Sequence, residues 1–307
     1  MNHFLDLCGW SGKDLWQLIQ MAVHLKNEFR SGGNRPVLKG QILGMVFQKP
    51  SLRTRVSFEV GMKHLGGDAI MLGPAEIGLG KRESIPDVAR VLSGYVDGIM
   101  ARVFDHKHVT GLAEHATVPV INGLSDERHP CQAMADVLTI YENFGHLEGL
   151  KLAYIGDGNN VAASLLAACA QFGMHFAIAT PEGYELSAKT LVDTAPHARR
   201  TGITIEAFTD SKLAAYEADV IYTDTWVSMG QEDEVKKREE KFKDFQINTE
   251  LLKHAKKTAV VLHCLPAHRG QEITDEVMDG PQSLVFAQAE NRLHAQKAIL
   301  VKLMGQR

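Results

Sequence analysis

Apolar residues recur along the chain in two spacings, one typical of helices and one of buried strands. Residues 11–30 repeat apolar side chains every three or four positions behind Ser11, which is placed to cap a helix. A continuous apolar run follows at residues 42–47, as in a buried strand. A second helical pattern then continues to Gly66, where a glycine suits the left-handed end of a helix. The chain is therefore expected to begin with a helix, a strand and a second helix.

The same alternation continues to the end of the chain. Further strands are expected at residues 69–72, 98–103, 118–122, 151–155, 176–180, 204–208, 220–222 and 259–262. Further helices are expected at residues 84–95, 109–115, 129–144, 161–172, 191–197, 213–217 and about 283–304. Strands that alternate with helices in this way predict mostly parallel sheets.

The length of 307 residues exceeds what one hydrophobic core usually supports, so two domains are expected. The predicted fold class is α/β, with two doubly wound parallel-sheet domains joined by interdomain helices. The helix at residues 129–144 is placed to bridge the two domains, and the last helix is long enough to return to the first. Two domains also leave room for a ligand-binding cleft.

Composition narrows the class of protein. Hydrophobic residues at 45% and charged residues at 23% are ordinary for a globular protein, and the net charge of −4 comes without the basic stripe that nucleic acid requires. No apolar run approaches the roughly 20 residues of a membrane span and no signal peptide is evident, so a cytoplasmic protein is expected. The four cysteines, Cys8, Cys131, Cys169 and Cys264, form no C-x-x-C pair, which predicts free thiols.

The segment Ser51-Leu52-Arg53-Thr54-Arg55 stands where a strand ends and a helix begins. Backbone N–H groups and the positive end of the helix point outward there, so an anion is favoured. The Arg53 guanidinium suits phosphate oxygens, the two hydroxyls are further donors, and Leu52 still offers its backbone amide. A solvated basic turn capped by Ser51 is an equally acceptable interpretation of these five residues alone.

Two further segments combine polar side chains with a strand or helix end. Arg102 ends an apolar strand, so either a carboxylate or a substrate anion must meet its charge. His129 and Gln132 open a helix, where a neutral histidine can donate to a carbonyl oxygen and Gln132 reaches the same ligand. The alternative for the latter pair is that both side chains cap their own helix.

Residues 156–161, Gly-Asp-Gly-Asn-Asn-Val, occupy the position of a dinucleotide-binding turn between a strand and a helix. The match is incomplete because Val161 replaces the third glycine of that fingerprint. A different ligand is therefore considered, with the Asn160 amide donating to a carboxylate. A tight structural turn is the remaining interpretation.

Two loops that follow strands complete the set of candidate sites. Asp224 opens the loop at 224–230, where its carboxylate can hold an ammonium group, and Cys264 follows the strand at 259–262. Cys264 is interpreted either as a nucleophile or, more commonly for this residue type, as a small hydrophobe. The charged run at 234–241 predicts a solvated helix without a site, and no metal-ligand motif is found among the histidines.

Taken together in order and spacing, these motifs resemble those of the ornithine carbamoyltransferases over essentially the whole chain. The quoted motifs are Ser51-Leu52-Arg53-Thr54-Arg55, Met100-Ala101-Arg102, His129-Pro130-Cys131-Gln132, Gly156-Asp157-Gly158-Asn159-Asn160, Asp224 with Ser228-Met229-Gly230, His263-Cys264-Leu265-Pro266 and Arg292. The resemblance implies a carbamoyl phosphate domain at 1–133, with a helix at about 288–307 packing back on it, and an ornithine domain at 134–287. It also implies no metal and no organic cofactor, and a homotrimer or a multiple of trimers.

The resemblance assigns each motif a role in making citrulline and phosphate from ornithine and carbamoyl phosphate, in arginine biosynthesis or breakdown. It implies that the phosphate is held by Ser51, the Leu52 amide, Arg53, Thr54 and Arg102. It implies that the carbamoyl end is held by His129, Gln132 and Arg292. It implies that ornithine is bound by Asn160, Asp224, Ser228 and Met229, while Cys264 and Leu265 line the reacting centre.

One departure and three rival functions remain at this point. The family's phosphate segment commonly begins Ser-Thr, whereas Leu52 stands here in place of the threonine and removes one hydroxyl donor. The rivals are transfer to another acceptor (putrescine, an acylated ornithine or aspartate), a nicotinamide-dependent dehydrogenase, and a non-catalytic protein that binds a phosphate ligand. The loops at 224–230 and 263–266 favour ornithine among the acceptors.

Overall fold

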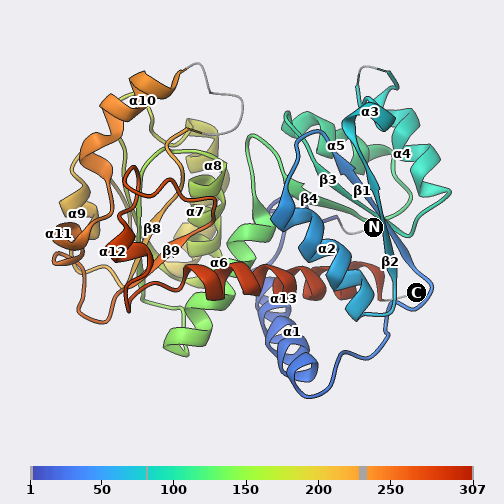
Figure 1. Cartoon of the computed structure of the whole chain (residues 1–307), viewed down its shortest axis with the longest axis horizontal. Coiled ribbons are helices and arrows are strands. Elements are labelled where there is room, and N and C mark those ends of the chain that lie inside the picture. Colours follow the sequence, from blue (N-terminus) through green and yellow to red (C-terminus); the bar gives the residue numbers. More distant parts are fainter. Residues whose placement is uncertain (1–2, 81, 228–233, 306–307) are drawn as a thin grey trace. The chain divides into compact units, whose positions relative to one another are not determined.

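The computed structural model describes residues 3–80, 82–227 and 234–305. The chain divides into two compact units, unit 1 (Met1–Leu138 with Glu290–Arg307) and unit 2 (Thr139–Ala289). Each unit contains one sheet whose strands are all parallel, flanked by helices (Figure 1). The predicted α/β class with parallel sheets is therefore confirmed.

Unit 1 contains a four-stranded sheet in the order β2-β1-β3-β4. Its strands are β1 (Ile42–Phe47), β2 (Asp68–Leu72), β3 (Gly98–Arg102) and β4 (Val120–Leu124). Its helices are α1 (Gly12–Arg30), α2 (Leu52–His64), α3 (Pro74–Ile77), α4 (Ile85–Ser93) and α5 (His106–His115). Every residue of β3 is buried and only the first residue of β1 is not, because helices cover both faces of a parallel sheet.

Unit 2 contains a five-stranded sheet in the order β7-β6-β5-β8-β9. Its strands are β5 (Lys151–Ile155), β6 (His175–Ala179), β7 (Ile205–Phe208), β8 (Val220–Thr223) and β9 (Val260–His263). Its helices are α7 (Asn160–Phe172), α8 (Ala188–Thr201), α9 (Ser211–Ala215), α10 (Val235–Phe242), the short 3-10 helix η2 (Lys243–Phe245), α11 (Thr249–Leu252) and α12 (Asp275–Met278). Helix α7 is buried all along, which is why its sequence is apolar on every side.

Two long helices contain the points at which the units divide. Helix α6 (Pro130–Phe144) passes from unit 1 to unit 2 after Leu138, and α13 (Val285–Met304) passes back after Ala289. The polar residues of interest at the start of α6 and on α13 from Glu290 onward therefore belong to unit 1.

In each sheet the strand order reverses direction once. In unit 1 the chain runs from β1 to its neighbour β2 and then crosses to β3 on the other side of β1. In unit 2 it runs outward through β5, β6 and β7 and then crosses to β8 on the other side of β5. Ligands of open parallel sheets bind beyond the carboxyl ends of the strands at such a switch point. The residues after β1, β3, β5 and β8 are thus the ones that the topology gathers.

Most predicted elements lie within two or three residues of the observed ones, and the differences have local causes. The charged run at 234–241 was expected to be fully solvated, but Arg238 on α10 is 5% exposed and is paired with Asp157. The helix predicted at 213–217 ends earlier, at Ala215, and Glu217 adopts a left-handed φ of 53°. All four cysteines are free, as predicted. Among the described residues, no helix is both long enough and apolar enough to span a membrane.

Candidate active site

The N-terminus of α2 carries the segment that follows β1. Ser51 is extended and caps the helix, its hydroxyl accepting from the Thr54 N–H at 3.3 Å. Leu52 opens the helix and is 76% exposed, so this leucine contributes little packing to unit 1. Arg53 follows it half-buried, and its Nε has no hydrogen-bond partner among the described residues. The first-turn N–H groups of a helix lack partners within the helix, and four residues separate the end of β1 from the start of α2.

The Thr54 hydroxyl is the centre of the cluster in unit 1. It is fully buried and accepts a hydrogen bond from Arg292 Nη2 at 2.9 Å, from Arg102 Nη1 at 3.4 Å and from the Ser51 hydroxyl at 3.1 Å. Arg102 ends β3 beside β1, and Arg292 lies on α13. Two buried guanidinium groups thus meet at one hydroxyl on a helix N-terminus, an arrangement that favours a bound anion.

His129 lies just before α6 and is 4% exposed. Its burial holds the pKa of the imidazole well below the ordinary value, and the positive charges of Arg292, Arg102 and Arg53 lower that pKa further. The sequence suggested a neutral histidine because of the helix end, whereas the structure attributes its neutrality mainly to desolvation and to these arginines. A neutral imidazole can donate one hydrogen bond to a carbonyl oxygen.

Gln132 stands one turn along α6 from His129, so the two side chains share a face of the helix. Gln132 is 1% exposed, and its Nε2 donates to Asp136 Oδ1 at 2.8 Å. The Gln132 side chain does not cap its own helix in this contact, because its amide bonds to another side chain. Unit 1 therefore brings together Ser51, Thr54, Arg102 and Arg292 by direct bonds, and His129 by electrostatic interaction.

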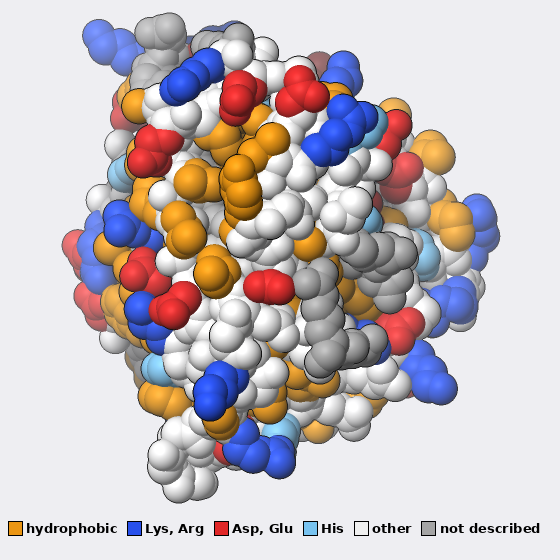
Figure 2. All heavy atoms as spheres, turned by 90° about the vertical axis from the view of Figure 1, so that its right-hand side faces the viewer, with side chains coloured by type: hydrophobic (Ala, Val, Ile, Leu, Met, Phe, Trp, Pro, Cys, Tyr) orange, Lys and Arg blue, Asp and Glu red, His pale blue; other side chains and the backbone are white. Residues whose placement is uncertain are grey.

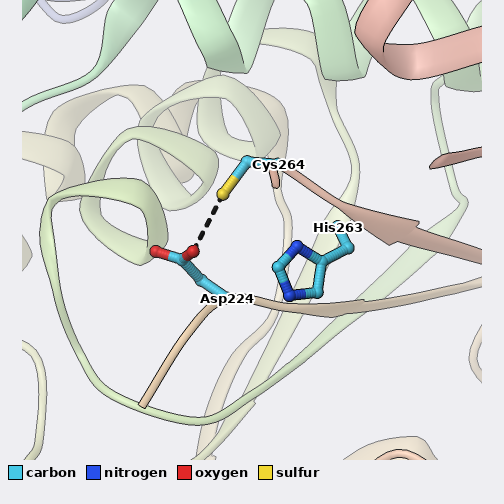
Figure 3. A group of neighbouring side chains, drawn as sticks. All are labelled: Asp224, His263 and Cys264. Atoms are coloured by element: carbon cyan, nitrogen blue, oxygen red, sulfur yellow. Dashed lines mark hydrogen bonds between the residues drawn. The ribbon is translucent and has the colours of Figure 1, made fainter. Parts of the chain in front are cut away.

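Unit 2 gathers a second cluster around Asp224, directly after β8. Asp224 Oδ2 accepts from the Asn159 amide at 2.8 Å, and Oδ1 accepts from the Cys264 thiol at 2.9 Å and from the Thr225 N–H at 2.8 Å. Figure 3 shows the Cys264 sulfur directed at the Asp224 carboxylate, with the His263 ring beside them. The carboxylate is therefore held in one orientation by donors from three segments of the sheet's carboxyl edge.

His263 takes part in a different network. Its Nδ1 accepts from the Leu265 N–H at 2.9 Å, so the proton of the neutral ring is on Nε2, which faces Glu272 Oε1 at 3.0 Å. Asp224, His263 and Cys264 have potential ligand atoms within 4.8 Å of one another. The His263 Nδ1 accepts from the backbone and the Cys264 thiol donates to Asp224, so a metal ion bound by these atoms would have to displace both hydrogen bonds.

The glycine turn after β5 does not match a dinucleotide site. A Cβ on Gly158 would lie 2.5 Å from the backbone carbonyl carbon of Glu185, and the Gly158 N–H donates to Tyr184 O at 2.8 Å. This glycine is therefore required for close packing against the chain at 184–186, which leaves the dehydrogenase interpretation without its main support. Asn160 is the first residue of α7 and is half-buried.

Leu265, also half-buried, has a φ of 59°. A left-handed leucine is strained, and such residues often occur at functional sites. Ser228 and Met229, which the sequence assigned to ornithine, lie outside the described residues.

Sequence reasoning missed two residues that the structure places in this cluster. Asn159 caps α7 with its carbonyl oxygen, which accepts from the N–H groups of Val161 and Ala162, and its amide holds Asp224. Tyr154 donates to the same Asn159 oxygen at 3.3 Å, and burial raises the pKa of its phenol well above the ordinary value, so it is a neutral donor. An asparagine three residues before the helix's apolar face is the cap signal that was available for Asn159.

Comparison with known proteins gives a consistent picture. Residues 2–142 match the family described as "Aspartate/ornithine carbamoyltransferase, carbamoyl-P binding domain", and residues 148–303 match its "Asp/Orn binding domain". The chain is 52% identical to an ornithine carbamoyltransferase of Symbiobacterium thermophilum over 99% of this chain and 98% of that protein. It is also 52% identical to an anabolic ornithine carbamoyltransferase of Pyrococcus furiosus, over 99% and 96%.

Solved structures agree with these matches. The ornithine carbamoyltransferase of Pyrococcus furiosus superimposes with a TM-score of 0.97 at 51% identity, covering 100% of this chain and 98% of that one. An N-acetyl-L-ornithine transcarbamylase superimposes with a TM-score of 0.89 at 31% identity, covering 99% and 100%. The same fold thus occurs with different acceptors, and the acceptor must be argued from identity and from the site.

Proposed function

The chain belongs to the aspartate/ornithine carbamoyltransferase family and transfers the carbamoyl group of carbamoyl phosphate to the side-chain amine of L-ornithine, and we propose that its two clusters divide the two substrates between them. Unit 1 binds carbamoyl phosphate and unit 2 binds ornithine. The observation that carries this division is the buried Thr54 hydroxyl with Arg102 and Arg292 upon it, at the N-terminus of α2.

The phosphate group is bound at the start of α2. The donors are the hydroxyls of Ser51 and Thr54, the Leu52 backbone amide and the guanidinium groups of Arg53 and Arg102. These groups offer the planar, charged donors that phosphate oxygens accept best, and they also stabilise the phosphate as it departs. Because the Leu52 side chain points to solvent, its replacement of a threonine affects this site only through the missing hydroxyl.

The carbamoyl end lies against His129, Gln132 and Arg292. His129 donates to the carbonyl oxygen in its neutral form, since burial, and after it the neighbouring arginines, keep the pKa of its ring low. Attack of the amine turns that oxygen into an oxyanion, which Thr54, Arg102 and His129 stabilise. Such preorganised donors are worth about 3 kcal/mol each in comparable sites.

Ornithine is held in unit 2 by Asp224, Asn160, Ser228 and Met229. The Asp224 carboxylate, fixed by Asn159 and Cys264, suits the α-ammonium group, and the Asn160 amide suits the α-carboxylate. Cys264 and Leu265 line the reacting centre. The side-chain amine attacks in its neutral form and forms the new carbon–nitrogen bond, the carbon–oxygen bond to phosphate breaks, and the proton that the amine loses passes to the departing phosphate, which leaves citrulline and hydrogen phosphate.

The choice of acceptor is tested by supplying carbamoyl phosphate with ornithine, putrescine, aspartate or N-acetylornithine and measuring each carbamoylated product. Ornithine is expected to have the highest kcat/KM, because it alone of the four combines a side-chain amine with an α-ammonium group for Asp224 and an α-carboxylate for Asn160. Preference for N-acetylornithine or putrescine would transfer the chain to another acceptor class. Arg53→Ala, assayed with ornithine, is expected to lose most activity, and a near-normal kcat/KM would remove Arg53 from the phosphate site.

We further propose that the chain acts in arginine biosynthesis, in the cytoplasm, as a homotrimer or a multiple of trimers. One relative at 52% identity bears the description anabolic, and four free thiols suit a reducing compartment. Figure 2, which faces the side of unit 1 carrying α3, α4 and β2, shows apolar side chains gathered among charged ones. In unit 1, Ile70 lies on the edge strand β2, and Ile70, Val91 and Tyr95 are 49%, 53% and 75% exposed.

An exposed apolar patch on a sheet edge is typical of a contact between subunits. Light scattering during size-exclusion chromatography is expected to give three times the chain mass of 33.8 kDa, or a multiple of that. The Val91→Asp variant should shift the particle towards the monomer, whereas Val192→Asp, at a still more exposed valine of unit 2, should not. A monomeric wild-type protein would refute the assembly without affecting the proposed chemistry.

A further inference from the structure

Gln132 and Asp136 form a buried pair on α6 that the proposed chemistry uses only in part. They stand one helical turn apart, are 1% and 0% exposed, and are joined by the 2.8 Å bond from Gln132 Nε2 to Asp136 Oδ1. A buried carboxylate beside an amide is costly unless it makes a hydrogen bond, so the contact is strongly favoured. The proposed binding of the two substrates gives Gln132 a contact with the carbamoyl group but gives Asp136 no contact with either substrate.

The hydrogen bond of the pair shows which way the Gln132 amide points. The NH₂ group donates to the Asp136 carboxyl oxygen, so the carbonyl oxygen of the amide faces the opposite side. That oxygen, Oε1, is buried and has no hydrogen-bond partner among the described residues. A buried acceptor is rarely left unsatisfied, so a donor from a ligand is expected there.

The surroundings restrict what that donor is. The neighbouring cluster consists of donors, namely Arg53, Arg102, Arg292 and the neutral His129, and these suit the phosphate and carbonyl oxygens. The one part of carbamoyl phosphate that donates is its NH₂ group. An outward-facing carbonyl oxygen on Gln132 is therefore matched to that group and to no other atom of the substrate.

We propose that Asp136 is a positioning residue that orients the Gln132 amide and thereby makes the site select a carbamoyl group over an acetyl group of the same shape. The inference rests on the proposed placement of the carbamoyl end at Gln132. With the amide fixed, Gln132 accepts from the carbamoyl NH₂. With the amide reversed, the NH₂ group of Gln132 would face the NH₂ group of carbamoyl phosphate. The methyl group of acetyl phosphate forms no hydrogen bond, so its binding would depend little on the orientation of the amide.

The test compares three ligands without ornithine, so that no turnover occurs: carbamoyl phosphate, acetyl phosphate and inorganic phosphate, with dissociation constants from calorimetry. In Asp136→Asn the new side chain donates as well as accepts, and Gln132 is free to reverse. The variant is expected to bind carbamoyl phosphate about 5- to 30-fold more weakly, while its affinities for acetyl phosphate and phosphate change less than twofold. An unchanged ratio of carbamoyl to acetyl affinity, or equal weakening of all three ligands, overturns the proposal.

Gln132→Met separates this inference from the proposed function beneath it. If Gln132 contacts the carbamoyl group, the methionine variant loses the preference for carbamoyl over acetyl phosphate. If it retains that preference, the placement of the carbamoyl end is wrong. If Gln132→Met loses the preference and Asp136→Asn keeps it, the placement stands and only the role of Asp136 is refuted.

A measurement on the unaltered protein covers the case in which Asp136→Asn does not fold. Neutron diffraction from crystals exchanged into D₂O distinguishes the nitrogen of the Gln132 amide from its oxygen by the attached deuterium. Deuterium is expected between Gln132 and Asp136. Deuterium on the opposite side of the Gln132 amide overturns the proposal.

Discussion

Replacing Thr54 with valine tests the cluster at its centre. Valine has nearly the shape of threonine, and Ser51 still caps α2 through the backbone N–H of residue 54. The hydroxyl alone is lost, together with the acceptor for Arg292 at 2.9 Å and for Arg102 at 3.4 Å. The effect therefore reports on how far this hydroxyl organises the two arginines.

The magnitude follows from these distances. A hydrogen bond from a charged donor contributes about 1.5–3 kcal/mol, and the 3.4 Å contact with Arg102 lies beyond the usual range, so it contributes the smaller part. The free energy of unfolding is expected to fall by about 2 kcal/mol. If Arg292 and Arg102 lose their alignment with the carbonyl oxygen and phosphate, about 3 kcal/mol of transition-state stabilisation is lost, which lowers kcat/KM for carbamoyl phosphate about 100-fold.

The assay pairs urea unfolding, at one fixed protein concentration, with citrulline formation at saturating ornithine. Thr194→Val is the matched control, since Thr194 is also fully buried and its hydroxyl donates to the Thr190 carbonyl at 2.8 Å in unit 2. The control should lose stability and keep its activity. A Thr54→Val enzyme whose kcat/KM stays within twofold of the wild type would show that the arginines are aligned without this hydroxyl.

Three other substitutions test separate parts of the structure. Asn159→Ser keeps the helix cap but removes the donor to Asp224. The KM for ornithine should therefore rise about tenfold, while carbamoyl phosphate binding and stability change little. An unchanged KM for ornithine would contradict this role of Asn159. Arg238→Met leaves the buried Asp157 without its partner and should lower the free energy of unfolding, measured in urea, by about 3 kcal/mol. A loss below about 1 kcal/mol would show that the ion pair contributes little to stability. Burial lowers the pKa of Lys297 to about 8, so between pH 8 and 10.5 the unfolded chain binds more protons and this group's contribution to stability rises with pH. The stability of the wild type relative to Lys297→Met should therefore rise by at most about 3 kcal/mol between pH 8 and pH 10.5, and a difference that stays constant over this range would refute the shift.

Elements that depend on local sequence were predicted well. Ser11 caps α1, Ser51 caps α2 and Gly66 follows α2 with a left-handed φ of 83°, as their residue types indicated. Strands buried on both faces are continuous apolar runs, which is why β1 and β5 were found at their observed bounds. Short helices such as α3 and α11 were missed, because four residues carry too little periodicity to be recognised.

Contacts between distant segments could not be predicted in this way. Arg238 belongs to a run of charges whose pattern is that of a solvated surface, yet packing turns it inward to Asp157, 81 positions away. Of the two adjacent asparagines after β5, the sequence favoured Asn160, whereas the conformation of the turn directs Asn159 to Asp224. In both cases the local residue types allow either orientation, and only a partner brought in from elsewhere in the chain selects one.

The sequence by itself determined the α/β class, the order of strands and helices, and the motifs whose combination identifies the family. It did so because caps, glycine turns and apolar periodicities act over a few residues. The tertiary structure alone decided which of those polar residues meet. Arg292 reaches Thr54 across 238 positions, and His129 is neutral because burial and three arginines from separate segments act on it at once. Both outcomes depend on distance in space and on exclusion of water, which no local pattern of residues records.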